Sequence, residues 1–393
     1  PSTPVYLPDG TFSNDVSQIE YGNPVRQALD VNINNKVNRI IASAFAEVNL
    51  LPGFNFRVQV SGDVRTELEN WFNPPNPNAF DGTDWRGQAS KRNFNQRAWT
   101  LENYFTYKLN LNNHNFTFLV GNTLQETMWE SSFILVSGIE SDKIQTLNAG
   151  TDIDVATSDK QAYGINSYFG RIDYNYKDKY LLLLNARYDG SSRFGKEHRY
   201  GFFPSASVGW RISDEYFLES ANFLANWKIR VSYGITGNQE ISNYASRGIM
   251  SIGTGTNIGG NYTDLTGAVI SSLPSPNLKW EETTQFNIGT DVSLFKSRVD
   301  FTMDYYIKTT NDLLFLVPIP STMGLSHKWE NIGKMENRGI EFSVNANIIS
   351  NDKFNWNANF IISKNNNKVL ELMNNKDVIV SGAGGSSIAR VGE

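Results

Sequence analysis

The chain lacks cysteine altogether, which excludes disulfide bonds and thiolate metal sites. Histidine is scarce: His114, His198 and His327 lie far apart and outside any HExxH motif, so a histidine-based metal site is not expected. A run of about 18 apolar residues is also missing, so the sequence contains no transmembrane helix. Acids and bases are interspersed at a net charge of -5, and without a basic tract no nucleic-acid partner is expected.

What the sequence contains in abundance is alternation of apolar and polar residues over about ten positions. The segments 180–188 and 227–235 each place apolar or aromatic side chains at every second residue. A strand with this pattern has one apolar face and one polar face. Strands of soluble proteins usually end near five or six residues, whereas tilted strands of about ten are what a lipid bilayer requires.

Alternation and turn residues together predict roughly twelve strands. They lie at 38–50, 54–66, 93–110, 114–128, 161–176, 179–190, 201–212, 226–238, 283–295, 298–311, 338–350 and 353–364. Tight turns are expected near 51–53, 111–113, 177–178, 296–297 and 351–352, and long connections at 67–92, 129–160, 191–200, 239–282 and 312–337. The remaining connection, 213–225, is expected to hold a small helix with Ser213 as its N-cap.

Short and long connections alternate in phase along the chain. A transmembrane β-barrel has this asymmetry, with short periplasmic turns and long extracellular loops. We therefore predict an all-β protein, a transmembrane antiparallel β-barrel whose long loops near 67–92, 129–160, 239–282 and 312–337 are extracellular. Tyrosine, tryptophan and phenylalanine near many strand ends favour the same interpretation, because amphipathic rings prefer the boundary between lipid and water.

The polar faces of these strands carry many charges, and a charged side chain facing lipid at mid-bilayer costs about 2–4 kcal/mol. The charges are therefore expected to face a lumen. The candidate lumen-facing residues are Arg187, Arg211, Arg230, Asp291 and Asp304. Hydration, or packing against a polar domain within the barrel, explains these residues more simply than contact with a transported substrate.

No motif in the sequence predicts catalysis. The segment 189–195 (DGSSRFG) resembles the start of a calcium loop but lacks the later carboxylates, and a hairpin loop explains it better. The glycines at 253–260 have no following Lys-Ser/Thr and no strand–helix context, so a phosphate loop is not expected. The sequence has no GxSxG motif and no convincing Ser-His-Asp set. We therefore expect no enzyme activity and no cofactor.

Several ordered phrases resemble one family. The sequences KYLLLLNARYDGSSRFGKEHRYGFFPSASVGWRISDEYFL (179–218), NWKIRVSYGITGNQEISNYA (226–245) and NIGKMENRGIEFSVNANII (331–349), with the segment 277–320 between them, resemble the SusC/RagA-type TonB-linked outer-membrane transporters of Bacteroidetes. The resemblance is clearest over about 160–370.

The resemblance implies a 22-stranded barrel with a plugged lumen in the outer membrane, of which residues 1–393 would supply about half of the strands. No plug domain, TonB-contacting segment or closing C-terminal strands are seen in the sequence, so we expect a partial barrel belonging to a longer protein. It further implies active import of oligosaccharides or peptides, a SusD-like lipoprotein partner, and energy from the TonB–ExbB–ExbD complex. A passive porin or export channel, or a soluble β-rich adhesin, are the alternatives.

Overall fold

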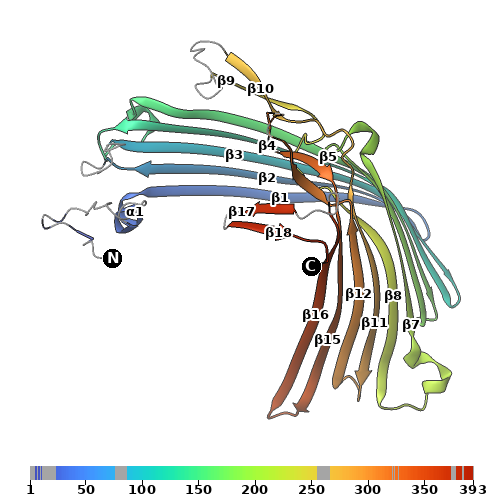
Figure 1. The fold of residues 1–393 in the computed structure, drawn as a ribbon. Coiled ribbons are helices and arrows are strands. Elements are labelled where there is room, and N and C mark those ends of the chain that lie inside the picture. The colour runs from blue at the N-terminus through green and yellow to red at the C-terminus, as the bar shows by residue number, and fades with distance from the viewer. Residues whose placement is uncertain are drawn as a thin grey trace. The chain divides into compact units, whose positions relative to one another are not determined.

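Strands account for nearly all of the regular structure (Figure 1). The computed structural model describes residues 24–75, 86–254, 266–320, 327–372, 378–382 and 385–392, together with residues 5, 6, 8, 10, 322, 324 and 325. A short helix, α1 (Pro24–Asp30), precedes the first strand. The chain divides into two units: unit 1 comprises 1–44, 60–100 and 125–162, and unit 2 comprises 45–59, 101–124 and 163–393.

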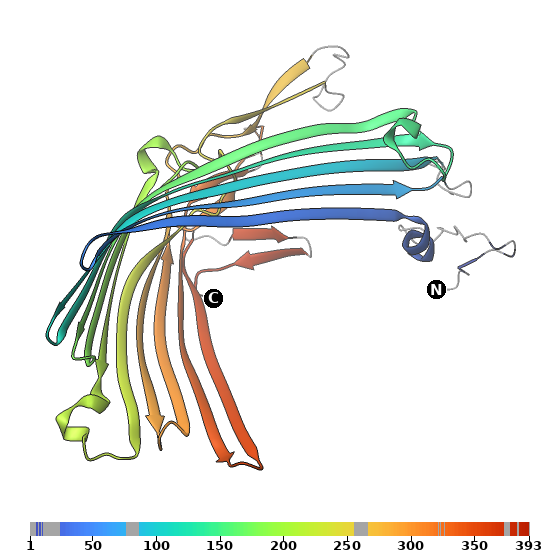
Figure 2. The ribbon, with the colours of Figure 1, turned by 180° about the vertical axis from the view of Figure 1, so that it is seen from behind.

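Twelve strands form one sheet and follow one another in sequence order, apart from hairpins inserted in two connections. They are β1 (Asn32–Leu51), β2 (Phe54–Asn73), β3 (Gly87–Leu111), β4 (His114–Ile139), β5 (Asp152–Tyr176), β6 (Tyr180–Ser191), β7 (Tyr200–Arg211), β8 (Leu224–Asn238), β11 (Glu281–Leu294), β12 (Val299–Asn311), β15 (Lys334–Ser350) and β16 (Asn355–Glu371). The pairs from β5 to β16 are antiparallel, and Figures 1 and 2 show β7 to β16 side by side from both directions. Each strand predicted from alternation is present.

The expected tight turns are also present, and their backbone explains why they are short. Between β5 and β6, Lys177 and Asp178 have φ of 53° and 56°, and the Lys179 amide donates to the Tyr176 carbonyl at 3.0 Å. Two consecutive positive φ angles twist the chain in the sense that matches antiparallel strands. The Asn175 carboxamide oxygen accepts from the Asp178 amide at 2.8 Å, which secures the turn.

The predicted long connections at 67–92 and 129–160 are wrong in extent. Strand β2 continues to Asn73 and β3 begins at Gly87, while β4 continues to Ile139 and β5 begins at Asp152. The extensions were missed because regular alternation is lost in them: TSDK at 157–160 is polar on both faces and FILV at 133–136 is apolar on both, whereas alternation marks a strand only where the two faces differ. Backbone pairing itself does not need that contrast.

The other two long connections contain hairpins that the sequence did not predict. Strands β9 (Ile249–Thr254) and β10 (Thr266–Ser272) pair within 239–282, and β13 (Leu314–Pro318) and β14 (His327–Asn331) pair within 312–337. A further hairpin, β17 (Val378–Gly382) with β18 (Gly385–Ala389), follows β16. These strands were missed because segments of five to seven residues are too short for a pattern of period two to stand out.

The small helix predicted at 213–225 is replaced by two 3₁₀ turns, Ile212–Asp214 and Tyr216–Leu218. Ser213 does not cap a helix. It lies inside the first turn, where its hydroxyl donates to Asp214 Oδ1 at 3.0 Å. An N-cap residue precedes the first helical residue, and Ser213 is itself inside the turn.

Buried apolar residues gather in two clusters rather than between layers: one joins the long connections of unit 2 to Phe203 of β7, and the other lies at strand ends in unit 1. In unit 2 a connection core is formed by Phe194, Phe203, Ile241, Ala245, Leu278 and Trp280. Unit 1 has a smaller cluster of Phe72, Ala89, Val136 and Ile139. The two faces of the sheet, between the short turns and these buried clusters, are therefore the candidate functional surfaces.

Candidate functional site

One face of the sheet in unit 2 carries apolar side chains in rows that cross from strand to strand. The register places the members of one row directly opposite one another from β6 to β15: Leu182, Val208, Val231, Ile288, Tyr305 and Ile340. A second row crosses from β8 to β16: Trp227, Val292, Phe301, Val344 and Phe360. The side-chain period of two keeps such rows on one face, so a single register unites the apolar residues of all these strands.

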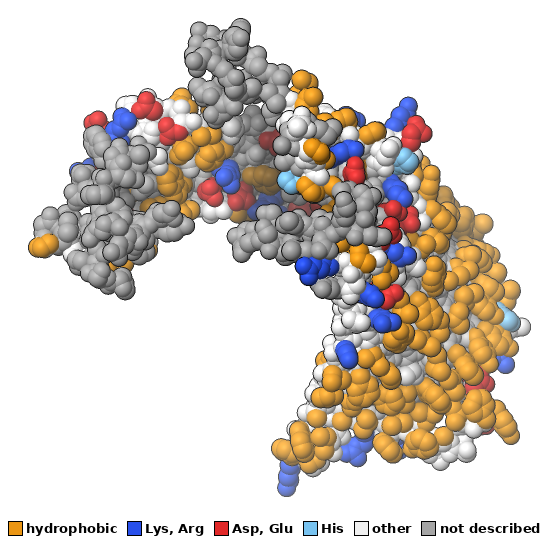
Figure 3. Space-filling model, viewed as in Figure 1, with side chains coloured by type: hydrophobic (Ala, Val, Ile, Leu, Met, Phe, Trp, Pro, Cys, Tyr) orange, Lys and Arg blue, Asp and Glu red, His pale blue; other side chains and the backbone are white. Residues whose placement is uncertain are grey.

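Most of this apolar face is left uncovered by the described chain. Val208 is 54% exposed, Phe202 57% and Phe360 58%. Figure 3 shows a broad hydrophobic surface over the strands that Figure 1 labels β7 to β16. Exposed apolar surfaces of this extent are sites of protein or membrane contact. A soluble sandwich would pack this face against a second sheet.

Aromatic rings line the apolar face beside the short turns. Neighbouring rings lie between 4.5 and 6.5 Å apart from β3 to β7. We call this row the turn belt: Tyr107, Phe116, Phe118, His114, Tyr174, Tyr176, Tyr180 and Trp210. At the other end of the strands Tyr188 and Tyr200 stack at 4.7 Å. The eight residue steps from Tyr180 to Tyr188 rise about 26 Å, close to the height of the apolar band that aromatic girdles flank in membrane barrels.

Glu215 ties two rings of the turn belt together. The Tyr180 hydroxyl donates to Glu215 Oε1 at 2.7 Å, and the Trp210 indole donates to the same oxygen at 3.0 Å. These bonds, Tyr180 first, hold the pKa of the Glu215 carboxyl below its ordinary value. Polar anchors of this kind keep the outer edges of amphipathic rings in a wet layer.

The lowered pKa makes the turn belt sensitive to acid. A group whose folded-state pKa is depressed stabilises the fold above its unfolded pKa of about 4.3, and that contribution is lost as pH falls through the folded value. We expect thermal unfolding of the full-length protein to shift to lower temperature between about pH 5 and pH 3. The variant Glu215→Gln should lose this part of the pH dependence, and an unchanged pH profile in Glu215→Gln would show that the carboxylate contributes nothing.

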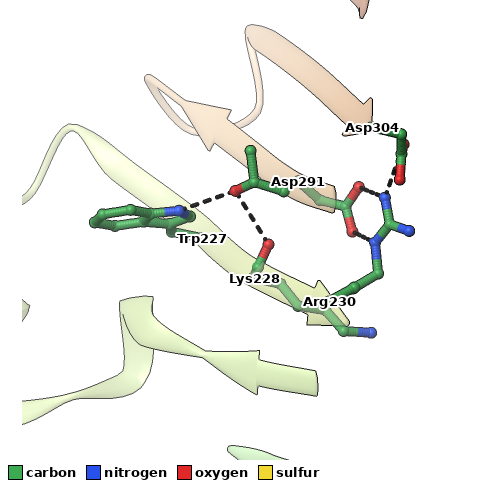
Figure 4. A network of polar contacts seen from close by, with 6 residues as sticks. Trp227, Lys228, Arg230, Asp291 and Asp304 are labelled. Atoms are coloured by element: carbon green, nitrogen blue, oxygen red, sulfur yellow. Dashed lines mark hydrogen bonds and ion pairs between the residues drawn. The ribbon is translucent and has the colours of Figure 1, made fainter. Parts of the chain in front are cut away.

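The opposite, polar face holds a charge network that spans three strands (Figure 4). Arg230 of β8 donates to Asp291 of β11 through Nε at 2.7 Å and Nη2 at 3.0 Å, and Nη2 also reaches Asp304 of β12 at 3.2 Å. Figure 4 shows the guanidinium between the two carboxylates. Bidentate pairing fixes the plane of the guanidinium as well as its position.

A glycine makes this network possible. In the sheet register Arg230 lies opposite Gly289 of β11, and Gly289 lies opposite Asp304. A Cβ at Gly289 would overlap Asp304 Oδ1 and lie 2.9 Å from Arg230 Nη2. Without a side chain at this point, the guanidinium reaches across the whole width of β11. A glycine within a strand indicates such a close approach. Gly289 is therefore a signal present in the sequence, but the pattern of apolar and polar residues does not reveal it.

Substituting Gly289 by alanine should therefore break the contact between Arg230 and Asp304 while leaving the Asp291 pair in place. We expect a loss of about 1 kcal/mol in the free energy of unfolding, because the obstructing atom is the mobile end of a side chain. Asp304→Asn should weaken the same contact. Urea titration of Gly289→Ala, Asp304→Asn and the double variant should show non-additive losses; strictly additive losses would contradict the shared contact.

The structure thus brings three of the five predicted site residues together and leaves the other two in local pairs. Arg187 bonds Asp189 through Nε at 3.2 Å and Nη2 at 3.0 Å, two residues along β6. Arg211 reaches Asp214 at 3.5 Å in the adjacent 3₁₀ turn. Each of these arginines pairs with a carboxylate of its own segment, and neither joins the network around Arg230.

Sequence reasoning missed the polar centre of the connection core. Arg193, within the DGSSRFG segment, is 7% exposed; its Nε donates to Asn243 Oδ1 at 2.9 Å and its Nη1 to the Gln239 carbonyl at 3.1 Å. Its guanidinium carbon also lies 4.2 Å from the Tyr163 ring centroid. The partners come from distant parts of the chain, and no local pattern could have revealed them.

Among the residues that the structure describes, no group of three or more His, Cys, Asp or Glu side chains could hold a metal ion. None of the helices in the same part of the chain is long and apolar enough to cross a membrane.

A sheet with an uncovered apolar face, aromatic borders and a charged opposite face defines the class of outer-membrane β-barrel proteins. Residues 3–382 match the family model described as TonB dependent receptor-like, beta-barrel. The chain belongs to this family, whose members are receptors and transporters of the outer membrane. The predicted resemblance, fold class and outer-membrane location are confirmed.

The chain is also similar to individual proteins. It is 38% identical over 368 residues to TonB-dependent receptor P39 of Formosa agariphila, covering 93% of this chain and 34% of the relative. It is 29% identical to TonB-dependent receptor SusC of Bacteroides thetaiotaomicron, covering 87% of this chain and 34% of SusC. A solved structure of the RagAB peptide transporter superposes with a TM-score of 0.85 at 26% identity, covering 94% of this chain and 40% of that one. The chain thus spans between a third and two-fifths of these proteins.

Proposed function

We propose that the protein to which this chain belongs imports oligosaccharides or peptides across the outer membrane, with energy supplied by TonB, ExbB and ExbD. A SusD-like surface lipoprotein is the proposed partner at the extracellular mouth. The twelve strands are proposed to form part of a 22-stranded barrel, with the long connections outside the cell. In this arrangement the polar face lines the lumen, and Arg187, Arg211, Arg230, Asp291 and Asp304 belong to that lining.

The observation that carries the proposal is the contrast between the two faces of one sheet. An apolar face that the described residues leave largely uncovered requires hydrocarbon, while the network of Arg230, Asp291 and Asp304 requires water or a polar neighbour. Family membership favours import over passive diffusion, and one structural relative is a peptide transporter. A soluble adhesin would have to bury its apolar face, so that alternative has no support.

The test is uptake by the native bacterium. Cells lacking the complete gene should lose uptake of a subset of labelled oligosaccharides or peptides, and the gene supplied on a plasmid should restore it. Cells lacking TonB should show the same loss. Uptake that persists without TonB, together with high conductance of the purified full-length protein in planar bilayers, would favour a passive porin or an export channel instead.

A further inference from the structure

The connection between β7 and β8 exposes two adjacent aromatic side chains. Tyr216 is 87% exposed and Phe217 is 65% exposed. Both lie in the 3₁₀ turn Tyr216–Leu218, in the segment that Figures 1 and 2 show beside the end of β8. Neighbouring aromatic side chains that stand out from a folded chain in this way indicate contact with a membrane or with another protein.

The segment that carries these rings is ordered by its own backbone. The amides of Glu215, Leu218, Ala221 and Leu224 each donate to the carbonyl three residues earlier, beginning with Ile212, at 2.9 to 3.0 Å. Four hydrogen-bonded turns therefore follow one another without a break from β7 to β8. Ile212 is buried, and the first turn packs against β8. The exposure of the two rings is thus a property of a fixed backbone.

The segment lies on the same side of the sheet as the turn belt. Glu215, the residue before Tyr216, accepts from Tyr180 and Trp210 at 2.7 and 3.0 Å. Those two rings are opposite each other in the register of β6 and β7, with centroids 6.5 Å apart. They belong to the apolar face, so Glu215 holds the segment against the part of that face which borders the short turns.

Distance places the two exposed residues in the headgroup layer of the membrane. Consecutive Cα atoms are about 3.8 Å apart, so the Cα atom of Phe217 lies within about 8 Å of that of Glu215. The headgroup layer on each side of a bilayer is about 5–8 Å thick. Since aromatic belts mark the inner border of this layer, the backbone of Tyr216 and Phe217 reaches no further than its outer border.

The charges around the two rings suit a zwitterionic surface. Lys179 Nζ lies 3.7 Å from Glu215 Oε2, and Arg211 Nη1 lies 3.5 Å from Asp214 Oδ2. Because of these two pairs, residues 211–218 together with Lys179 carry no net charge. A headgroup with one phosphate and one ammonium group meets no uncompensated charge here, whereas a charged protein partner would find no complementary surface on this segment.

We propose that residues 212–218 form an interfacial anchor, which binds zwitterionic phospholipids of the leaflet on the side of the short turns. Tyr216 and Phe217 insert among the headgroups, where aromatic rings are favoured, and Glu215 couples this insertion to the turn belt. The anchor extends the lipid contact of the protein from its strands to a connection. The inference goes beyond the proposed import function and needs only the outer-membrane location that family membership gives.

Fluorescence quenching by brominated lipid tests the anchor. The chain has no cysteine, so bimane can be attached at one introduced position: Phe217→Cys in the anchor, Phe118→Cys in the turn belt, or Asp352→Cys in another short turn. Any cysteine elsewhere in the full-length protein is first replaced by serine. After refolding into phosphatidylcholine vesicles, lipid brominated near its headgroup should quench the Phe217→Cys label about as strongly as the Phe118→Cys label.

The Asp352→Cys label is the matched control and should remain unquenched. Asp352 is exposed at the short-turn end of the sheet, so its label also shows whether the dye enters the membrane by itself. Equal quenching at Asp352→Cys and Phe217→Cys would make the result a property of the dye. An unquenched Phe217→Cys label would place the segment in water, where a periplasmic protein would be its partner. Either outcome would overturn the anchor.

Urea titration in the same vesicles gives a measurement without a dye. Replacing both rings, Tyr216→Ser with Phe217→Ser, should lower the ratio of folded to unfolded protein about tenfold or more, which corresponds to roughly half burial of each ring. Glu219→Gln with Ser220→Ala is the control, because both residues are exposed polar positions of the same connection, and it should leave the ratio unchanged. Equal ratios in the two double variants would contradict insertion of the rings.

Discussion

Replacing Ala206 by arginine is expected to destabilise the folded full-length protein by about 2–4 kcal/mol, the cost of a cation at the midplane of a membrane barrel. Ala206 lies on the apolar face between Leu184 of β6 and Tyr233 of β8, midway between the two aromatic borders. It is exposed, so the loss would come from lipid contact rather than from a steric clash. Urea titration of the protein refolded into phosphatidylcholine vesicles measures the difference.

The adjacent residue provides the control. Ser205 lies on the polar face opposite Gly234, and its Oγ accepts from Asn185 Nδ2 at 3.3 Å. Ser205→Arg should change the free energy of unfolding by no more than about 1 kcal/mol, the worth of that one hydrogen bond. Equal losses in the two variants would mean that the apolar face does not contact lipid, and the membrane orientation of the sheet would have to be abandoned.

The substitution Gly195→Ala should have the second large effect. Its new methyl group would overlap the backbone carbonyl oxygen of Pro276 and lie 2.9 Å from the carbonyl carbon. Backbone cannot rotate away as a side chain can, so the 192–199 connection must separate from the turn at 275–278. We expect a cost of about 1–3 kcal/mol and a looser connection core around Phe194 and Trp280. Limited proteolysis of residues 239–280 and tryptophan fluorescence would both report it.

A second glycine shows whether the effect is specific. Gly170 of β5 has only one neighbouring heavy atom within 4 Å of a built Cβ, the Leu119 carbonyl oxygen at 3.8 Å. Gly170→Ala should therefore leave protease resistance unchanged. If Gly195→Ala were equally resistant, the close approach to Pro276 would not matter for the core.

The main strands could be predicted because their signal is local. Period-two alternation and turn residues act within ten positions, and all twelve predicted segments are strands. The same locality explains the errors. The ends of β2 and β5 were missed because polar residues occupy both faces there, and the hairpin of β13 and β14 was missed because each strand has only five residues.

The site could be predicted only in part, for a related reason. The alternation of side chains along each strand assigns Arg230, Asp291 and Asp304 to polar faces. Whether the three side chains contact one another depends on the register between strands, which the turns set. The connection core depends on residues such as Phe194 and Trp280, whose rings lie 5.2 Å apart although 86 positions separate them.

The guanidinium that crosses β11 also has a mechanical consequence. If strand β8 slid by two residues against β12, Arg230 would move about 7 Å, well beyond reach of Asp304. A slide by one residue would turn every side chain of the strand to the wrong face. The network therefore resists sliding of β8 along β11 and β12. In the proposed transporter, this resistance would matter when a substrate or an inner domain moves along the polar face of these strands.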